Sequence, residues 1–194
     1  MSALCVKSER SVTSGQDYND EQRGVGYLTG PSDFGFTNPV VTKWTEHPKR
    51  KAKRGDILVT VKGSGVGKIN LLDVEEVAIS RQLMAVRATA ADVSYLYAFL
   101  STNFGYFQSI SKGAAIPGIS REDILDLMCP MPPPGEQEAI VKLIHSLATE
   151  TQCLETIYQQ KLDNLAELKR AILQKAFAGE LTAQPEKGLQ EAAE

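Results

Sequence analysis

A helical segment from Gly135 to Ala178 constrains the fold of this 194-residue chain more than any other feature. The run Met131-Pro-Pro-Pro-Gly135 precedes the segment, and no further proline or glycine occurs before Gly179. Acidic residues begin the segment and basic residues end it, as the helix macrodipole favours. At 1.5 Å per residue the helix is about 65 Å long, whereas a globule formed by residues 1–134 has a radius of gyration of about 14 Å. Most of the helix therefore requires a partner outside its own domain.

Apolar residues recur along this segment at intervals of three and four, which is typical of a coiled-coil seam. The same register puts Thr151, Tyr158 and Lys161 on the seam. A long homodimer with ideal heptads would lose stability at such polar positions, whereas an antiparallel pairing brings a different residue against each of them. The pattern favours an antiparallel coiled coil, and a helix packed lengthwise on its own domain is the alternative. The predicted dimerisation residues are Ile140, Ile144, Leu147, Leu154, Leu165, Leu168 and Ile172.

The residues before the helix predict a β-rich domain, so the expected fold class is α+β. Residues 1–54 are rich in loop-forming residues, with short strands expected at 25–28 and 39–42. Further strands are expected at 56–61, 68–72, 76–79 and 83–86, a helix at 94–109, and a short helix from Arg121 that Ser120 and Asp123 cap. We expect three parts: a β-rich domain at 1–134, the long helix at 135–179, and a disordered polar tail at 180–194.

Charge is unevenly distributed along the chain, although its formal net charge is only -3. Between Val40 and Asn70 there are eight basic residues and two acidic ones, so this stretch is strongly basic and the rest of the chain is acidic. Such a distribution would attract a polyanion to one face and repel it from the others. A solvated basic loop is the alternative interpretation.

The segment Gly63-Ser-Gly-Val-Gly-Lys68 follows an expected strand and invites comparison with nucleotide-binding loops. A P-loop needs glycine at the position of Lys62 and serine or threonine at the position of Ile69, and a dinucleotide fingerprint needs glycine at the position of Lys68. The spacing thus argues against nucleotide hydrolysis. A glycine-rich connection flanked by lysines could instead approach DNA phosphates closely.

Side chains that could read base edges follow the strand expected at 76–79, where Arg81 and Gln82 stand. Trp44 and its neighbours are further candidates. The complete set of candidate DNA-binding residues is Lys43, Trp44, Lys49, Arg50, Lys51, Lys53, Arg54, Lys62, Ser64, Lys68, Arg81 and Gln82.

Cysteine and histidine are too sparse to predict a metal site. The three cysteines and two histidines lack CxxC spacing or any clustering. No stretch is long and apolar enough for a membrane span, and the first residues lack the apolar core of a signal peptide. We therefore expect a cytoplasmic protein without a metal ion.

Several segments resemble the specificity subunit of type I restriction-modification systems, and the resemblance covers nearly the whole chain. Its most specific parts are the Gly-Asp-Ile-Leu segment with its glycine loop and the proline-rich step into Glu-Gln and a long helix. The matching segments are Gly26-Tyr-Leu-Thr-Gly-Pro-Ser-Asp33, Val41-Thr-Lys-Trp-Thr45, Gly55-Asp-Ile-Leu-Val-Thr-Val-Lys-Gly-Ser-Gly-Val-Gly-Lys68, Ala78-Ile-Ser-Arg-Gln-Leu83, Ile116-Pro-Gly-Ile-Ser120, Pro130-Met-Pro-Pro-Pro-Gly-Glu-Gln137 and Ala171-Ile-Leu-Gln-Lys-Ala-Phe-Ala-Gly-Glu-Leu181.

Members of that family usually carry two target-recognition domains, each followed by a long helix, and the two helices pair antiparallel. This chain has one such domain and one helix, so the resemblance implies a half-size specificity protein or a fragment of a larger one. Two copies could pair through their helices as a homodimer and read a palindromic split site. Pairing with another specificity chain is the alternative.

The resemblance implies a recognition subunit that binds double-stranded DNA, reads one half-site and scaffolds a DNA methyltransferase subunit. The restriction subunit is a further candidate partner. Methyl transfer with S-adenosylmethionine and ATP-driven translocation would occur in partner subunits, so we expect no catalysis and no cofactor in this chain. An assembly factor or antirestriction decoy that pairs through its helix without binding DNA is the alternative function.

Overall fold

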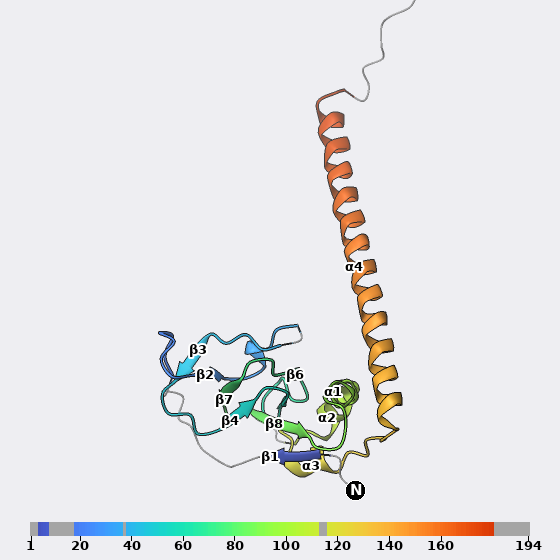
Figure 1. Ribbon diagram of the computed structural model, residues 1–194. Helices are drawn as coiled ribbons and strands as arrows, with labels where there is room; N and C mark the ends of the chain where they lie inside the picture. Colours follow the sequence, from blue (N-terminus) through green and yellow to red (C-terminus); the bar gives the residue numbers. More distant parts are fainter. Residues whose placement is uncertain (1–3, 8–17, 37, 113–115, 181–194) are drawn as a thin grey trace, which may run out of the picture. The chain divides into compact units, whose positions relative to one another are not determined.

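The computed structural model describes residues 4–7, 18–36, 38–112 and 116–180, and Figure 1 labels their helices and strands. Two compact units are present, Met1–Lys142 and Leu143–Glu194. The first contains every strand described below, three α-helices, a short 3-10 helix η1 (Pro31–Asp33) and the beginning of the long helix, whose remainder belongs to the second. The expected division at residues 134 and 179 stays a prediction, and residues 181–194 of the expected disordered tail lie outside the described residues.

Two four-stranded sheets form the β-rich unit. Sheet A has the strand order β1-β8-β5-β6 and is antiparallel throughout. Sheet B has the order β3-β2-β7-β4, in which β2 and β7 run parallel and the other pairs antiparallel. The strands are β1 (Leu4–Lys7), β2 (Val25–Leu28), β3 (Lys43–Thr45), β4 (Lys51–Lys53), β5 (Ile57–Thr60), β6 (Ile69–Leu71), β7 (Glu76–Ile79) and β8 (Leu83–Ala88).

Sheet A is buried on both of its faces, which explains the unbroken apolar run of β5. Ile57 and Val59 pack into one core with Leu96, Leu100 and other helical residues. Leu58, between them, faces a second core shared with sheet B. Alternating residues of one strand therefore fill two cores, and a strand in this position carries apolar side chains throughout.

The helix expected at 94–109 is two helices, α1 (Val93–Thr102) and α2 (Phe104–Ile110). Asn103 separates them: its backbone N–H donates to the carbonyl of Leu100, and its side-chain amide donates to the carbonyl of Phe99 at 2.8 Å. An asparagine can satisfy the carbonyls at a helix end in this way, so the chain turns without a glycine or proline to mark the break.

The short helix α3 (Arg121–Leu125) has the capping box expected from its sequence. The backbone N–H of Asp123 donates to Ser120 Oγ at 3.2 Å, and the backbone N–H of Ser120 donates to Asp123 Oδ2 at 2.6 Å. The pair satisfies two backbone donors at the start of the helix. The backbone N–H donation shifts the pKa of Asp123 below its ordinary value, with a smaller contribution from the Ser120 hydroxyl.

Three strands differ from the sequence-based expectation. The strand expected at 39–42 lies at Lys43–Thr45, and Pro39, which has no N–H, forms only an isolated bridge with Phe34. The strands β1 and β4 were not expected at all. The Lys-Ala-Lys sequence of β4 has little strand propensity, and β4 forms because it pairs with β7 at the edge of sheet B.

The long helix is α4, from Pro134 to Phe177, within one residue of the expected bounds. Near its start, Gln137 is 3% exposed. Its amide nitrogen donates to the carbonyl of Pro132 at 2.8 Å, and its amide oxygen accepts from the backbone N–H of Asp92 at 2.9 Å. Gln137 thus links the proline-rich segment before α4 to the residue that precedes α1. The α+β class with a long C-terminal helix is confirmed.

Candidate nucleic-acid interface

Three connections from different parts of the sequence meet at one place, and we call them the loop cluster: Thr29–Asp33, Lys62–Lys68 and Ser80–Gln82. Ser80 Oγ donates to the carbonyl of Thr29 at 2.5 Å, and the carbonyl of Gln82 accepts from the N–H of Val61, directly before Lys62, at 2.8 Å. Within the first connection, Asp33 Oδ2 accepts from the backbone N–H and the hydroxyl of Thr29 at 2.6 and 2.7 Å. The cluster is therefore a fixed surface and not three independent loops.

Two glycines allow these connections to approach each other. A Cβ on Gly30 would lie 2.3 Å from Gln82 Oε1, and a Cβ on Gly65 would lie 2.7 Å from Pro31 Cγ. Real Cβ atoms do not approach heavy atoms so closely, so a larger residue at either position would displace its neighbour. The glycines place Gln82 against the first connection and the glycine loop against Pro31.

The backbone of the glycine loop is largely engaged within the protein. The amides of Gly63, Val66, Gly67 and Lys68 donate to the carbonyls of Pro117, Gly63, Thr60 and Gly65, at 2.9 to 3.2 Å. These amides are therefore not available for a phosphate. The exposed residues of the loop that could contact a polyanion through their side chains are Lys62, Ser64 and Lys68.

The loop cluster brings together five of the residues that the sequence predicted to bind DNA. Lys62, Ser64 and Lys68 come from the β5–β6 connection, and Arg81 and Gln82 come from the β7–β8 connection. All five are exposed. Cationic side chains thus lie beside an amide side chain that can donate and accept hydrogen bonds at once.

A second group of basic residues lies on the outer face of sheet B. Lys43 is opposite Tyr27, Tyr27 is opposite Ala78, and Ala78 is opposite Lys51 in the strand register. Residues opposite each other share a face. Leu28 and its neighbours on the other face fill the core, so the row from Lys43 to Lys51 faces outward.

Two of these lysines already have partners. Lys43 Nζ lies 4.7 Å from the centre of the Tyr18 ring, which stacks on Tyr27 at 6.1 Å between ring centres. Lys51 Nζ lies 2.7 Å from Glu76 Oε1. The carboxylate of Glu76 thus partly compensates the charge of Lys51, whereas Lys43 keeps its charge beside the neutral Tyr18 ring.

Lys49 and Arg50 stand at the end of sheet B that leads into the loop cluster. The carbonyl of Arg50 accepts from the N–H of Ile79 at 3.0 Å, directly before Ser80. Arg50 Nε is buried and has no hydrogen-bond partner among the described residues. Lys49 is exposed.

The remaining candidates lie apart from the loop cluster. Lys53 and Arg54 are exposed at the other end of β4, where Arg54 donates its N–H to the carbonyl of Glu75 at 3.1 Å. Trp44 is half-buried and opposite Gly26 in the register, on the face opposite to that of Lys43. The structure therefore divides the basic stretch instead of presenting it as one patch.

An ion pair that the sequence did not reveal lies at the beginning of β5, between Asp56 and Arg87. Asp56 accepts from Arg87 Nε and Nη2 at 2.7 Å each, and its Oδ2 also accepts from the backbone N–H of Lys53 at 2.9 Å. Asp56 is 2% exposed. The only sequence signal was the Gly55-Asp56 pair before an apolar run, which also fits an ordinary turn.

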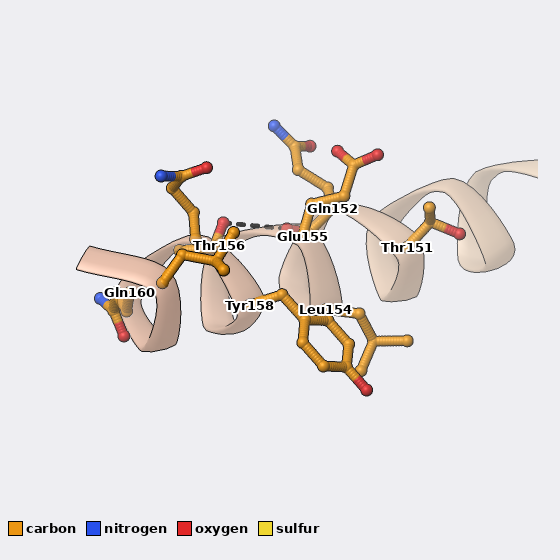
Figure 2. A pocket seen from close by; sticks show the side chains of 9 residues that line it. Thr151, Gln152, Leu154, Glu155, Thr156, Tyr158 and Gln160 are labelled. Carbon is orange, nitrogen blue, oxygen red and sulfur yellow. Dashed lines mark hydrogen bonds between the residues drawn. The ribbon is translucent and has the colours of Figure 1, made fainter. Parts of the chain in front are cut away.

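The seven predicted dimerisation residues of α4 are all exposed in the single chain, between 39% for Ile140 and 61% for Leu165. Figure 2 shows that Leu154 and Tyr158 point to one side of the helix while Gln152 and Glu155 point to another. The hollow drawn there is lined by side chains of α4 alone, so it is an open surface and not an enclosed cavity. An apolar stripe of this kind is typical of a helix that pairs with another helix.

Within the described ranges, no group of three or more histidine, cysteine, aspartate or glutamate side chains could hold a metal ion. Over the same residues, no helix has the length and hydropathy needed to cross a membrane.

Comparison with known proteins agrees with the geometry. Residues 35–164 match the family model described as the type I restriction modification DNA specificity domain. Among curated relatives, the type I restriction enzyme EcoBI specificity subunit of Escherichia coli is 28% identical over 144 residues, which are 72% of this chain and 30% of that protein. A Methanocaldococcus jannaschii protein, provisionally named the MjaX type I restriction enzyme specificity subunit, is 26% identical over 84% of this chain and 38% of its own length.

Solved structures show the same fold. A chain from work on the complex assembly and conformational transition of the type I R-M system superposes with a TM-score of 0.80, at 25% identity, over 90% of this chain and 43% of that one. The HsdS subunit from Thermoanaerobacter tengcongensis gives 0.73 at 26% identity, over 91% and 43%. The chain thus spans less than half of the length of these relatives, and it belongs to the family of type I restriction-modification DNA specificity domains.

Proposed function

We propose that this chain is the sequence-specific DNA-recognition part of a type I restriction-modification system, and that its β-rich unit reads one half-site of double-stranded DNA. The observation that carries the proposal is the loop cluster, where Lys62, Lys68, Arg81 and Gln82 converge from separate strands on a fixed and exposed surface. The names of the relatives support the same assignment.

The two kinds of side chain in the loop cluster would have different tasks. Lys62, Ser64 and Lys68 would contact phosphates and fix the position of the duplex, with Lys49 and Arg50 extending this contact along the end of sheet B. Arg81 and Gln82 would contact base edges, since guanidinium and amide groups can make paired hydrogen bonds with guanine and adenine in the major groove. Gly30 would support this task by leaving room for the Gln82 side chain.

Catalysis would lie in partner subunits. We assign methyl transfer with S-adenosylmethionine to a modification subunit and ATP-driven steps to a restriction subunit, and we assign this chain the tasks of recognition and scaffolding without a cofactor of its own. The spacing of the glycine loop supports this division, and so does the engagement of its amides within the protein. The complex would act in the cytoplasm.

The long helix would pair antiparallel with the helix of a second recognition unit. Its exposed stripe from Ile140 to Ile172 supports pairing, and a homodimer would read a palindromic site split by a spacer. The length of α4 would then set the distance between the two half-sites.

The positioning role can be tested by salt dependence. Each phosphate contact contributes about one unit to the slope of log K against log salt concentration, so Lys68→Ala should weaken binding to every duplex and reduce that slope by about one. Glu76→Ala serves as the control. It removes the ion-pair partner of Lys51 and no basic residue, so it should not reduce the slope. An unchanged slope for Lys68→Ala would remove Lys68 from the interface.

The reading role needs a different measurement. Gln82→Ala should relax the preference at one or two base pairs while leaving the salt slope unchanged, because an amide neutralises no phosphate. Affinities for duplexes that differ by single base pairs would show this. A uniform loss across all sequences would assign Gln82 a positioning task instead.

A further inference from the structure

The exposed stripe of α4 has more order than pairing with an unrelated helix requires. Its seam positions recur at intervals of three and four between Ile140 and Ile172, and they are spaced symmetrically about Thr156. Every heptad contains such a point of symmetric spacing, so spacing alone selects no partner. The residue types at equal distances from Thr156 are what distinguish this point.

Around Thr156, seam residues at equal distances match in polarity. Two antiparallel helices with a two-fold axis at this level bring each seam residue against the one equally far from Thr156 in the second copy. Leu154 then meets Tyr158, and Thr151 meets Lys161. The three outer pairs are wholly apolar: Ile140 with Ile172, Ile144 with Leu168, and Leu147 with Leu165.

Other registers lose this match. Sliding the second helix by one heptad in either direction places Thr151 against a leucine, which is Leu154 or Leu168. The threonine hydroxyl would then face an apolar side chain that offers no hydrogen bond. A parallel pair would instead bring Lys161 against its own copy, where like charges repel. The seam is thus complementary to itself in the register centred on Thr156.

The helix leaves Thr151 able to accept a hydrogen bond from the second copy. Its hydroxyl donates to the carbonyl of Leu147 at 2.8 Å. A hydroxyl has one hydrogen and two acceptor lone pairs, so Thr151 Oγ1 can still accept, while a lysine ammonium has three donors and no acceptor. Lys161 Nζ lies 5.4 Å from the centre of the Tyr158 ring, on the side of the helix that carries the seam. Thr151 and Lys161 are both exposed in the single chain.

We propose that α4 pairs with the α4 of a second copy of this chain about a two-fold axis at Thr156, and that Lys161 of each copy donates to Thr151 Oγ1 of the other. The inference rests on the antiparallel pairing in the proposed function and not on DNA recognition. It selects the homodimer over pairing with another specificity chain, because the seam complements itself. Glu155 would lie near its own copy at the exposed edge of the seam, where salt screens the repulsion.

The test places opposite charges at position 151 in two backgrounds and measures the dimer dissociation constant of the full chain by analytical ultracentrifugation without DNA. With Lys161 present, Thr151→Glu should dimerise about tenfold or more tightly than Thr151→Lys, because both equivalent contacts are attractive in one and repulsive in the other. In a Lys161→Glu background the order should reverse. Gln152→Glu and Gln152→Lys, on another side of the helix, should differ by about twofold or less in both backgrounds.

The outcomes separate the register from the proposed function. Equal behaviour of the two charges at position 151, whether both variants dimerise or neither does, would overturn the register. An order that does not depend on the residue at position 161 would overturn it as well, and both results leave DNA recognition standing. A wild-type chain that stays monomeric at micromolar concentration would overturn self-pairing and the register together. Failure of the chain to enrich any DNA sequence would contradict the proposed function without affecting the register.

Discussion

Asp56 illustrates how a residue in a recognisable motif can serve the fold and not the ligand. Its carboxylate is buried, pairs with Arg87 and accepts the N–H of Lys53, so it fixes the turn between β4 and β5. That turn precedes the strand whose other end carries the glycine loop. Asp56 therefore influences the interface only by holding β5 in place.

Removal of the Asp56 carboxylate should cost stability. We expect Asp56→Ala to lower the free energy of unfolding by about 2 kcal/mol, less than the loss for a fully buried pair because the Arg87 side chain is 38% exposed. Urea denaturation followed by circular dichroism measures the difference. Glu76→Ala, which breaks the exposed pair with Lys51, should cost about 0.5 kcal/mol or less. Equal losses for the two variants would contradict the structural role of Asp56.

Gly63 and Gly67 of the glycine loop have similar backbone conformations but different surroundings, so substitutions at the two positions can be compared. Both have positive φ, +96° at Gly63 and +85° at Gly67, so alanine is strained at either position. A Cβ on Gly67 would also lie 2.8 Å from Phe107 Cβ, whereas a Cβ on Gly63 meets nothing within 4 Å. Gly63→Ala should therefore cost about 1 to 2 kcal/mol of unfolding free energy and Gly67→Ala distinctly more. Denaturation curves in which Gly63→Ala loses as much as Gly67→Ala would refute the packing of the loop against α2.

At the scale of elements, the sequence predicted those whose pattern is imposed by burial. The unbroken apolar run of β5 was found because a strand between two cores must be apolar throughout, and Glu76–Ile79 was found because Val77 and Ile79 alternate into one core. β4 was missed because its Lys-Ala-Lys pattern buries only Ala52, and only its pairing with β7 makes it a strand. The break between α1 and α2 at Asn103 was missed because an asparagine can occur both on the polar surface of a continuous helix and at a helix end.

The capping box of α3 should make the stability of the fold depend on pH. Hydrogen bonds from Ser120 lower the pKa of Asp123 in the folded chain, so the carboxylate stabilises the fold above the ordinary aspartate value of 3.8 and loses this effect as the pH falls through the lower folded value. Asp123→Asn should therefore lower the melting temperature at pH 6, and its difference from the wild type should shrink below pH 3.8.

Glu122→Gln on the same helix is the control for that experiment, because its side chain makes no hydrogen bond among the described residues. Thermal unfolding at several pH values measures all three proteins. A difference between the wild type and Asp123→Asn that stays constant down to pH 3 would contradict the role of the capping box.

At the scale of the whole molecule, the distribution of charge was predictable but its placement was not. The sequence presents residues 40–70 as one basic stretch. The fold separates Lys53 and Arg54 from the loop cluster by the length of β4, occupies Lys51 with Glu76, and brings Arg81 and Gln82 next to the glycine loop. These contacts depend on strand order, in which β7 lies between β2 and β4, and no local pattern in the sequence reports that order.

The exposed stripe of α4 makes a prediction about assembly. The purified chain should be a dimer at micromolar concentration, because an apolar stripe from Ile140 to Ile172 is costly to leave in water. Leu154→Lys should shift the chain to monomer, whereas Gln152→Lys, on another side of the helix, should not. Light scattering after size-exclusion chromatography gives the mass. A wild-type chain that is monomeric at micromolar concentration would contradict self-pairing and favour a different helix as the partner.

Selection from a randomised duplex library tests the central claim most directly. The purified chain, alone and mixed with a type I modification subunit, is incubated with the library, and the bound duplexes are recovered and sequenced over several rounds. Recognition by the loop cluster predicts enrichment of a defined half-site, which a pair of chains would repeat as a palindrome across a fixed spacer. A chain that co-purifies with the modification subunit and enriches no sequence would contradict the account and assign the chain the role of a decoy.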